Sequence, residues 1–297
     1  MYVAVALEVK RIMCGPICFP TRQCGDRSER ELLHGRLSVI LETWLETKPS
    51  QIDVYSLQKL RARCTIWHSI EAVGVCAGEI LLSFDDGPNP IDDTTARLLD
   101  VLGQESVRGA FCVCGKSIGN APELVDRMMI DGHLLVNHSY WHQPFALFSE
   151  KSLAKEIDDC DAAIAGAVHS LSFRSKFFRP PCGWRTPVLE RLLPRLQKQL
   201  FPITHFGYDT NMTRHNYPQW VDRTLQAAKR DGGGLFVLHD RRLRFWGERF
   251  HDPTDKDSSA YRGWVPDAAA LLIRRCRDEG FRFMDPHMFA AGEGARS

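Results

Sequence analysis

Two adjacent aspartates, Asp85 and Asp86, are the residues of this sequence best suited to chemistry. They lie in residues 83–88 (SFDDGP), directly after the apolar run at residues 80–82. A short apolar run that ends at a Gly-Pro break is typical of a buried strand followed by a loop. Adjacent carboxylates repel each other unless a positive charge lies beside them, and a divalent cation commonly supplies it. Because Asp, Gly and Pro are also turn formers, a simple polar turn is the alternative at this point.

Two histidines four residues apart, His138 and His142, provide a second type of metal ligand. They can face one ion if the loop that carries them takes a helical turn. Two imidazoles and one carboxylate leave open positions for water and substrate, as in hydrolytic zinc sites and in non-haem iron oxygenases. A second carboxylate and His239 favour hydrolysis, because they can serve as general base and general acid. Oxygen activation needs no such pair.

Alternating strands and helices from residue 79 onward predict the elements that position these groups. The predicted strands are residues 80–84, 109–113, 133–136, 176–179, a segment within 201–208, 235–238 and 281–284. Helices are predicted between them, including residues 187–200 with a kink at Pro194. About seven β–α units in series predict an α/β fold whose parallel strands close into a barrel.

Polar residues follow five of the predicted strands. In a parallel barrel these strand ends all lie on one rim, so their side chains converge. The residues are Asp85 and Asp86 after the first strand, His138 and His142 after the third, Arg179 after the fourth, Asp209 after the fifth, and His239 with Asp240 after the sixth. This convergence predicts a metal site.

Composition and charge exclude several classes of protein. With 38 basic and 37 acidic residues, the net charge is +1, too small to attract nucleic acid or anionic lipid. No apolar run is long enough to span a membrane. The first residues lack the basic segment and the unbroken apolar segment of a secretory signal, so we expect a cytoplasmic location. An extracellular or cell-wall location is the alternative if the natural N-terminus differs.

Ten cysteines in a chain without a recognisable signal predict free thiols rather than a disulfide framework. A zinc knot near the start of the chain is disfavoured, because its spacing fits no standard finger; its residues would be Cys14, Cys18, Cys24 and His34. Cys112 and Cys114 alternate along an apolar segment and are interpreted as small buried hydrophobic residues.

The chain resembles the polysaccharide deacetylase family, also called the NodB homology domain or carbohydrate esterase family four, over roughly residues 79–290. Four motifs in the family's order carry the resemblance, and a fifth segment looks like the family's second strand. The motifs are residues 83–88 (SFDDGP), 138–142 (HSYWH), 179–184 (RPPCGW) and 238–239 (LH), and the segment is residues 109–115 (GAFCVCG). The resemblance implies a distorted (β/α)7-type barrel. It also implies metal-dependent removal of acetyl groups from oligo- or polysaccharides that contain N-acetylglucosamine.

The resemblance further implies a role for each motif residue. Asp85 would be the general base, and His239 the general acid that protonates the leaving amine. One divalent metal ion, usually zinc, would be held by Asp86, His138 and His142. The partner would be an acetylated saccharide; the oligomeric state stays open.

Three other residues would support this catalytic set. Arg179 would pair with Asp85 and orient it. The backbone N–H of Cys182, where the family usually has Tyr or Phe, would stabilise the oxyanion together with the metal. Asp209 matches part of the fourth motif, but the family's second aspartate and its tryptophan are missing. That departure leaves open how Arg179 and His239 are tuned.

Residues 1–75 carry no motif and are interpreted as an extension with helices at 29–46 and 51–63. The catalytic domain is placed at 76–290 and a flexible tail at 291–297.

Aromatic residues of the long segment 240–263 and its neighbour either shape a substrate groove or pack in the core; they are Phe245, Trp246, Tyr261 and Trp264. The alternatives to a saccharide deacetylase are a hydrolase of another linear amide or small acetylated metabolite, and a catalytically idle carbohydrate-binding domain.

Overall fold

A curled sheet of parallel strands forms the centre of the computed structural model, which describes residues 75–243 and 251–291. The strand order is β5-β4-β3-β2-β1-β7-β6, and β8 pairs with the start of β1. The strands are β1 (Glu79–Asp85), β2 (Ala110–Val113), β3 (Leu134–Asn137), β4 (Phe177–Phe178), β5 (Gln199–Leu200), β6 (His205–Phe206), β7 (Gly233–His239) and β8 (Arg282–Phe283). Within the described residues the edge strands β5 and β6 are not paired with each other, so the barrel is distorted and open on that side.

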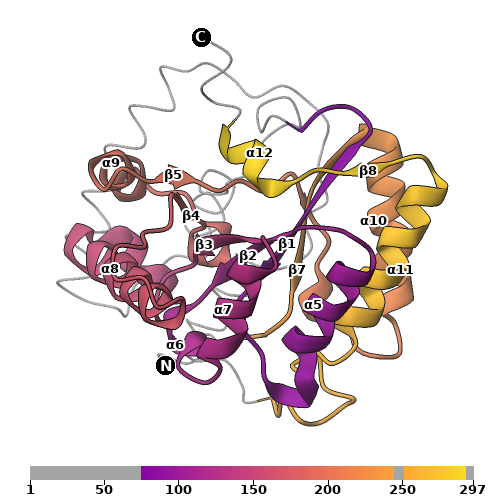
Figure 1. Ribbon diagram of the computed structural model, residues 1–297, viewed down its shortest axis with the longest axis horizontal. Coiled ribbons are helices and arrows are strands. Elements are labelled where there is room, and N and C mark those ends of the chain that lie inside the picture. The colour runs from indigo at the N-terminus through magenta and orange to yellow at the C-terminus, as the bar shows by residue number, and fades with distance from the viewer. Residues whose placement is uncertain (1–74, 244–250, 292–297) are drawn as a thin grey trace, which may run out of the picture.

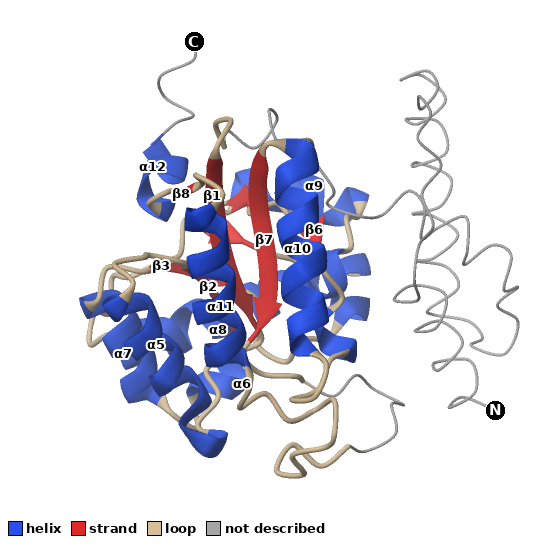
Figure 2. Cartoon of the chain, turned by 90° about the vertical axis from the view of Figure 1, so that its right-hand side faces the viewer, coloured by secondary structure: helices blue, strands red, loops and turns tan. Residues whose placement is uncertain are grey.

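Helices connect the strands and surround the sheet (Figures 1 and 2). The described α-helices are α5 (Thr94–Gln104), α6 (Gly115–Ile118), α7 (Pro122–Ile130), α8 (Glu150–Ala167), α9 (Pro187–Arg195), α10 (Tyr217–Asp231), α11 (Val265–Asp278) and α12 (Pro286–Ala291). This alternation of strand and crossover helix confirms the predicted α/β fold with a distorted barrel.

The central strands β1 and β7 place two predicted catalytic residues, Asp85 and His239, side by side. They pair in register over their whole length, from Glu79 opposite Gly233 to Asp85 opposite His239. On its other side β1 pairs with β2, where Asp85 lies opposite Cys112. Nearly all residues of β1 and β7 are buried, as expected for strands covered on both faces.

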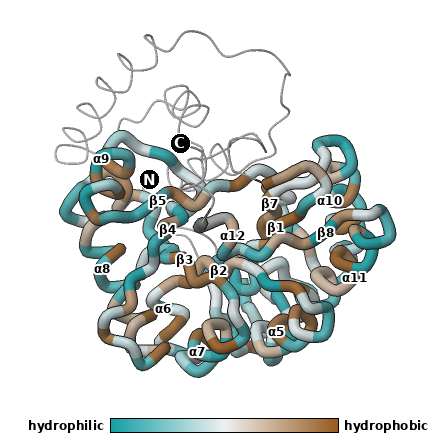
Figure 3. The backbone as a smooth tube through the Cα atoms, turned by 45° about the horizontal axis from the view of Figure 1, so that its top comes forward, coloured by the Kyte–Doolittle hydropathy of each residue, from teal (hydrophilic) through white to brown (hydrophobic). Residues whose placement is uncertain are grey.

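Each outer helix turns an apolar stripe toward the sheet. In α11 the buried residues recur at helical spacing and include Val265, Ala269, Leu272 and Cys276. Figure 3 shows the same alternation as hydrophilic and hydrophobic colours along α5, α7 and α11. Burial of one large aliphatic side chain contributes roughly 1.5–3 kcal/mol, so these stripes hold the helices on the sheet.

The prediction of one kinked helix over residues 187–200 is wrong. Helix α9 ends at Arg195, one residue after Pro194, and Gln199–Leu200 instead pair with β4 as β5. Between them, the buried Lys198 bonds through Nζ to the carboxylate of Asp161 at 2.6 Å. The chain therefore leaves the helix where tertiary contacts outweigh its local helical pattern.

Several predictions concern residues that the structure does not describe. The extension at residues 1–75, except Val75, lies outside the described residues, together with its two predicted helices and the cysteines of the disfavoured zinc knot. Most of the predicted tail lies outside them as well. No disulfide joins the cysteines in the described part of the chain. No described helix combines the length and apolar character needed to span a membrane.

Candidate active site

The carboxyl ends of the parallel strands bring the predicted site residues together. Asp85 and Asp86 lie at the end of β1, His138 follows β3, and His239 ends β7. Arg179 follows β4, and Asp209 begins the short helix η4 (Asp209–Asn211) after β6. These side chains are buried, and His142 is only partly exposed. The aspartate pair is therefore part of a polar cluster rather than an isolated turn.

Asp86 and two histidines form the candidate metal site. Oδ1 of Asp86 lies 3.4 Å from Nε2 of His138 and 3.3 Å from Nε2 of His142. His138 donates its Nδ1 hydrogen to the carbonyl of Arg179 at 2.7 Å, which leaves Nε2 free of hydrogen in the neutral ring. Among the described residues, Oδ1 of Asp86 has no hydrogen-bond donor although it is buried. A buried acceptor that faces two imidazole nitrogens suits a cation.

The protonation states of this cluster favour metal binding. Burial lowers the pKa of His142 to about 4 against the opposing charge of Asp86, so the ring is neutral at pH 7. Burial alone would raise the pKa of Asp86, but the neighbouring histidines hold it well below its usual range. A carboxylate and neutral imidazoles are the forms that bind metals.

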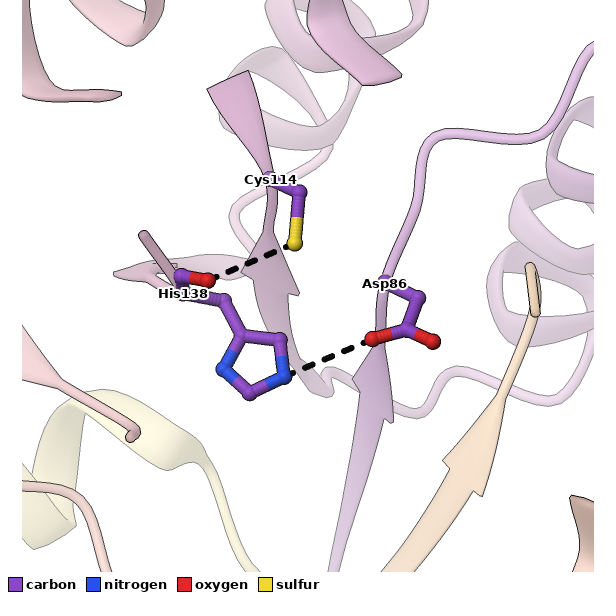
Figure 4. Close-up of side chains that lie close together, drawn as sticks. All are labelled: Asp86, Cys114 and His138. Carbon is purple, nitrogen blue, oxygen red and sulfur yellow. Dashed lines mark hydrogen bonds and ion pairs between the residues drawn. The ribbon is translucent and has the colours of Figure 1, made fainter. Parts of the chain in front are cut away.

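A cysteine predicted to be a small buried hydrophobic residue, Cys114, lies beside this cluster. Figure 4 shows the thiol of Cys114, at the end of β2, next to His138 and Asp86. One ligand atom from each of these three residues lies within 4.8 Å of the others. The thiol donates to the carbonyl of His138 at 3.4 Å. The family resemblance selects His142 as the third ligand instead, so a binding experiment must separate the two sets.

The loop that carries His138 and His142 is a bend and not the helical turn suggested by the spacing. Ser139 and His142 have φ angles of 67° and 54°, in the left-handed region. The loop is held by Glu156 of α8, whose carboxylate accepts from the backbone N–H groups of Tyr140 at 3.0 Å and Trp141 at 2.8 Å. A contact from helix α8 therefore helps to hold the loop between the two imidazoles.

The candidate base, Asp85, is paired with Arg179 as predicted from the resemblance. Nη1 of Arg179 lies 2.5 Å from Oδ1 of Asp85 and also donates to the Ser83 hydroxyl at 2.8 Å. Nη2 of Arg179 donates to the carbonyl of Pro202 at 2.9 Å, which fixes the guanidinium. The other carboxylate oxygen of Asp85 faces Nε2 of His138 at 3.8 Å. One oxygen is thus anchored and the other points toward the candidate metal site.

The candidate acid, His239, is paired with Asp209. Nδ1 of His239 lies 2.9 Å from Oδ1 of Asp209, and the backbone N–H of His239 donates to Oδ2 at 2.7 Å. Burial alone would lower the pKa of His239, but the charge and hydrogen bond of Asp209 outweigh it and raise the pKa to about 9. A second partner of Asp209, Arg262, was missed by the sequence analysis because no family motif contains it.

The remaining predicted residues are less closely defined. Cys182 is partly exposed in the short helix η3 (Pro181–Gly183) after β4, with a φ of 58°; its oxyanion role stays a prediction. Tyr261 and Trp264 are buried and pack in the core, so they do not line a groove. The other two aromatic residues of the proposed groove, Phe245 and Trp246, lie outside the described residues.

This fold and site define a class: a distorted parallel α/β barrel with a candidate acid–base set and a candidate metal cluster on its carboxyl-end rim. The family model described as "Polysaccharide deacetylase" matches residues 73–197. A chitooligosaccharide deacetylase of Sinorhizobium fredii is 33% identical over 210 residues, which are 70% of this chain and 90% of that protein. A second one, from Rhizobium leguminosarum bv. trifolii, is 32% identical over 54% of this chain and 71% of its own length.

A solved structure is similar in fold as well. The peptidoglycan deacetylase PdaC from Bacillus subtilis superposes with a TM-score of 0.57 at 25% identity, over 74% of this chain and 93% of that chain. The chain belongs to the polysaccharide deacetylase family.

Proposed function

We propose that the protein is a metal-dependent hydrolase that removes acetyl groups from N-acetylated saccharides, with an oligosaccharide containing N-acetylglucosamine as the expected substrate. The observation that carries the proposal is the single cluster of base, metal ligands and acid on one rim. Similarity to two chitooligosaccharide deacetylases and a peptidoglycan deacetylase supports the same substrate class. A catalytically idle binding domain is disfavoured, because the residues expected as base, metal ligands and acid are all present.

The donors on this rim fit a divalent metal ion. The buried Oδ1 of Asp86 lacks a hydrogen-bond donor in the described residues, and Nε2 of His138 and Nε2 of His142 face it. We assign these three residues as the ligands, with zinc as the expected metal for a carboxylate and two imidazoles. When bound, the ion polarises the acetamide carbonyl and lowers the pKa of water, which is the Lewis-acid chemistry that amide hydrolysis needs.

The chain's own residues then move the protons. Asp85 accepts a proton from the attacking water as the new C–O bond forms at the acetyl carbon. Arg179 keeps Asp85 oriented through the 2.5 Å contact to Oδ1. His239 donates its proton to the amine nitrogen as the C–N bond breaks, so that acetate and the free amino sugar leave. The peptide N–H of Cys182 is assigned to the developing oxyanion.

The proposed substrate class is tested by a panel of acetylated compounds scored for acetate. We expect release from N-acetylglucosamine oligomers by the metal-loaded protein and none after chelation. Release from small acetylated amides alone would mean that the protein uses the same mechanism on a small metabolite instead of a saccharide. An absence of release from every compound by protein that has bound metal would refute the proposal.

The pH dependence of the reaction is expected to report the His239–Asp209 pair. His239 must be protonated to act as an acid, so activity falls as pH rises through its pKa. Asp209 raises this pKa through its negative charge and its hydrogen bond. In Asp209→Asn the anion is lost, the pKa of His239 falls, and the alkaline limb of kcat/KM moves to lower pH. A limb that stays in place or moves upward would show that Asp209 does not tune the acid.

A further inference from the structure

A buried arginine outside every family motif contacts both Asp209 and His239, the two residues that we call the acid pair. Arg262 lies between β7 and α11, beyond the segment that the family model matches, and its side chain is fully buried. Burying a guanidinium is costly unless its hydrogen bonds are satisfied and its charge is paired. The partners of Arg262 therefore indicate what its position serves.

Those partners are Asp209 and His239. Nε of Arg262 donates to the carbonyl of His239 at 2.7 Å, and Nη1 donates to the carbonyl of Asp209 at 3.0 Å. Nη2 forms an ion pair with Oδ2 of Asp209. The planar guanidinium thus bonds to the backbone carbonyls of His239 and Asp209 and to one carboxylate oxygen. The single point charge of lysine cannot reproduce this geometry.

The arrangement leaves Asp209 one way to bind the imidazole. Its Oδ2 is occupied by Arg262 and by the backbone N–H of His239, so Oδ1 faces Nδ1 of His239. Because Nδ1 is held by the carboxylate, Nε2 is the nitrogen that can deliver a proton. Burial alone would raise the pKa of Asp209, but the charges of His239 and Arg262 outweigh this effect and lower the pKa. The carboxylate therefore stays ionised.

The guanidinium itself is held in place. Its central carbon lies 4.4 Å from the ring centroid of Trp264, which is buried and stacked on Tyr217 at 5.6 Å. Nε1 of Trp264 donates to the carbonyl of Tyr261 at 3.0 Å. This packing leaves Arg262 little freedom to move away from the acid pair.

We propose that Arg262 is a positioning residue that holds Asp209 on His239 and so directs the catalytic proton toward the leaving amine. The inference rests on the proposed function. It also explains how the acid pair is supported although the fourth motif lacks the family's second aspartate and tryptophan. The support comes from a residue 53 positions further along the chain.

The test compares two acetyl compounds that differ in their need for an acid. An N-acetylated oligosaccharide releases an amine that must be protonated, whereas 4-nitrophenyl acetate releases a phenolate that needs no proton. In Arg262→Met we expect kcat for the oligosaccharide to fall about 10- to 100-fold, part of the effect of a general acid. KM and the ester rate should stay within about threefold, and His239→Ala should show the same selectivity with a larger loss.

Matched variants separate positioning from folding. Arg275→Met removes another arginine, whose ion pair with Asp222 is largely exposed, and should leave both rates unchanged. Arg262→Lys keeps the charge without the fork and should fall between wild type and Arg262→Met. If Arg262→Met does not fold, the lysine variant carries the comparison.

A double substitution gives a second readout for the oligosaccharide alone. When Asp209 is already asparagine, Arg262 has no carboxylate to hold, so adding Arg262→Lys should cost less than about threefold. Equal losses on both compounds, or full additivity with Asp209→Asn, would make Arg262 a structural residue and overturn the inference. If the wild type releases no acetate from any saccharide, the proposed function fails, and the inference falls with it. That result is seen before any variant is compared.

Discussion

Asp85→Asn is expected to lose turnover by about a hundred- to ten-thousand-fold while it keeps its fold and its metal. Asparagine preserves the shape of the side chain but cannot accept a proton from the attacking water. Its amide oxygen can still accept from Arg179, so the contact that anchors the end of β1 is largely retained. The measurement is kcat for acetate release, with metal content and thermal unfolding followed in the same preparation.

The neighbouring aspartate provides the matched control. Asp86→Asn removes a charged ligand that faces His138 and His142, so metal affinity should fall first and activity should recover in part with added zinc. Zinc titrated into both variants while acetate is followed separates the two roles. Rescue of Asp85→Asn by zinc, with Asp86→Asn staying inactive, would mean that the assignments are reversed.

Replacing either His138 or His142 by alanine is expected to remove the metal and, with it, nearly all activity. Two remaining protein ligands seldom hold zinc firmly, because most of the binding free energy comes from three or four donors acting together. Metal content per chain, measured by elemental analysis after dialysis against a weak chelator, gives the result without reference to turnover. We expect about one ion in the wild type and almost none in either variant.

Two control variants make this experiment specific. His205→Ala removes a histidine that is paired with Asp231 away from the cluster, and it should retain the metal. Cys114→Ser should also retain it if the ligands are Asp86 and the two histidines. Loss of metal from Cys114→Ser, with full occupancy in His142→Ala, would instead identify the thiol as the third ligand.

The fold and most of the site could be predicted from the sequence because their signals are local. The apolar run before Asp85 and the Gly-Pro break after it mark the end of β1. Apolar runs also precede His138 and His239. Once parallel strands alternate with helices, their carboxyl ends lie on one rim, so the convergence of these residues follows from topology alone. Side-chain type then favours a metal site with a candidate base and a candidate acid.

The tertiary structure decided how these groups are held. Asp86, Ser139 and His142 take left-handed φ angles that no local pattern specifies, and contacts such as that of Glu156 with the loop sustain them. Arg262 bonds to both Asp209 and His239, yet it lies far from Asp209 along the chain and in none of the motifs. Local sequence encodes propensity and hydrophobic pattern, whereas a buried ion pair between distant residues exists only after the chain has packed.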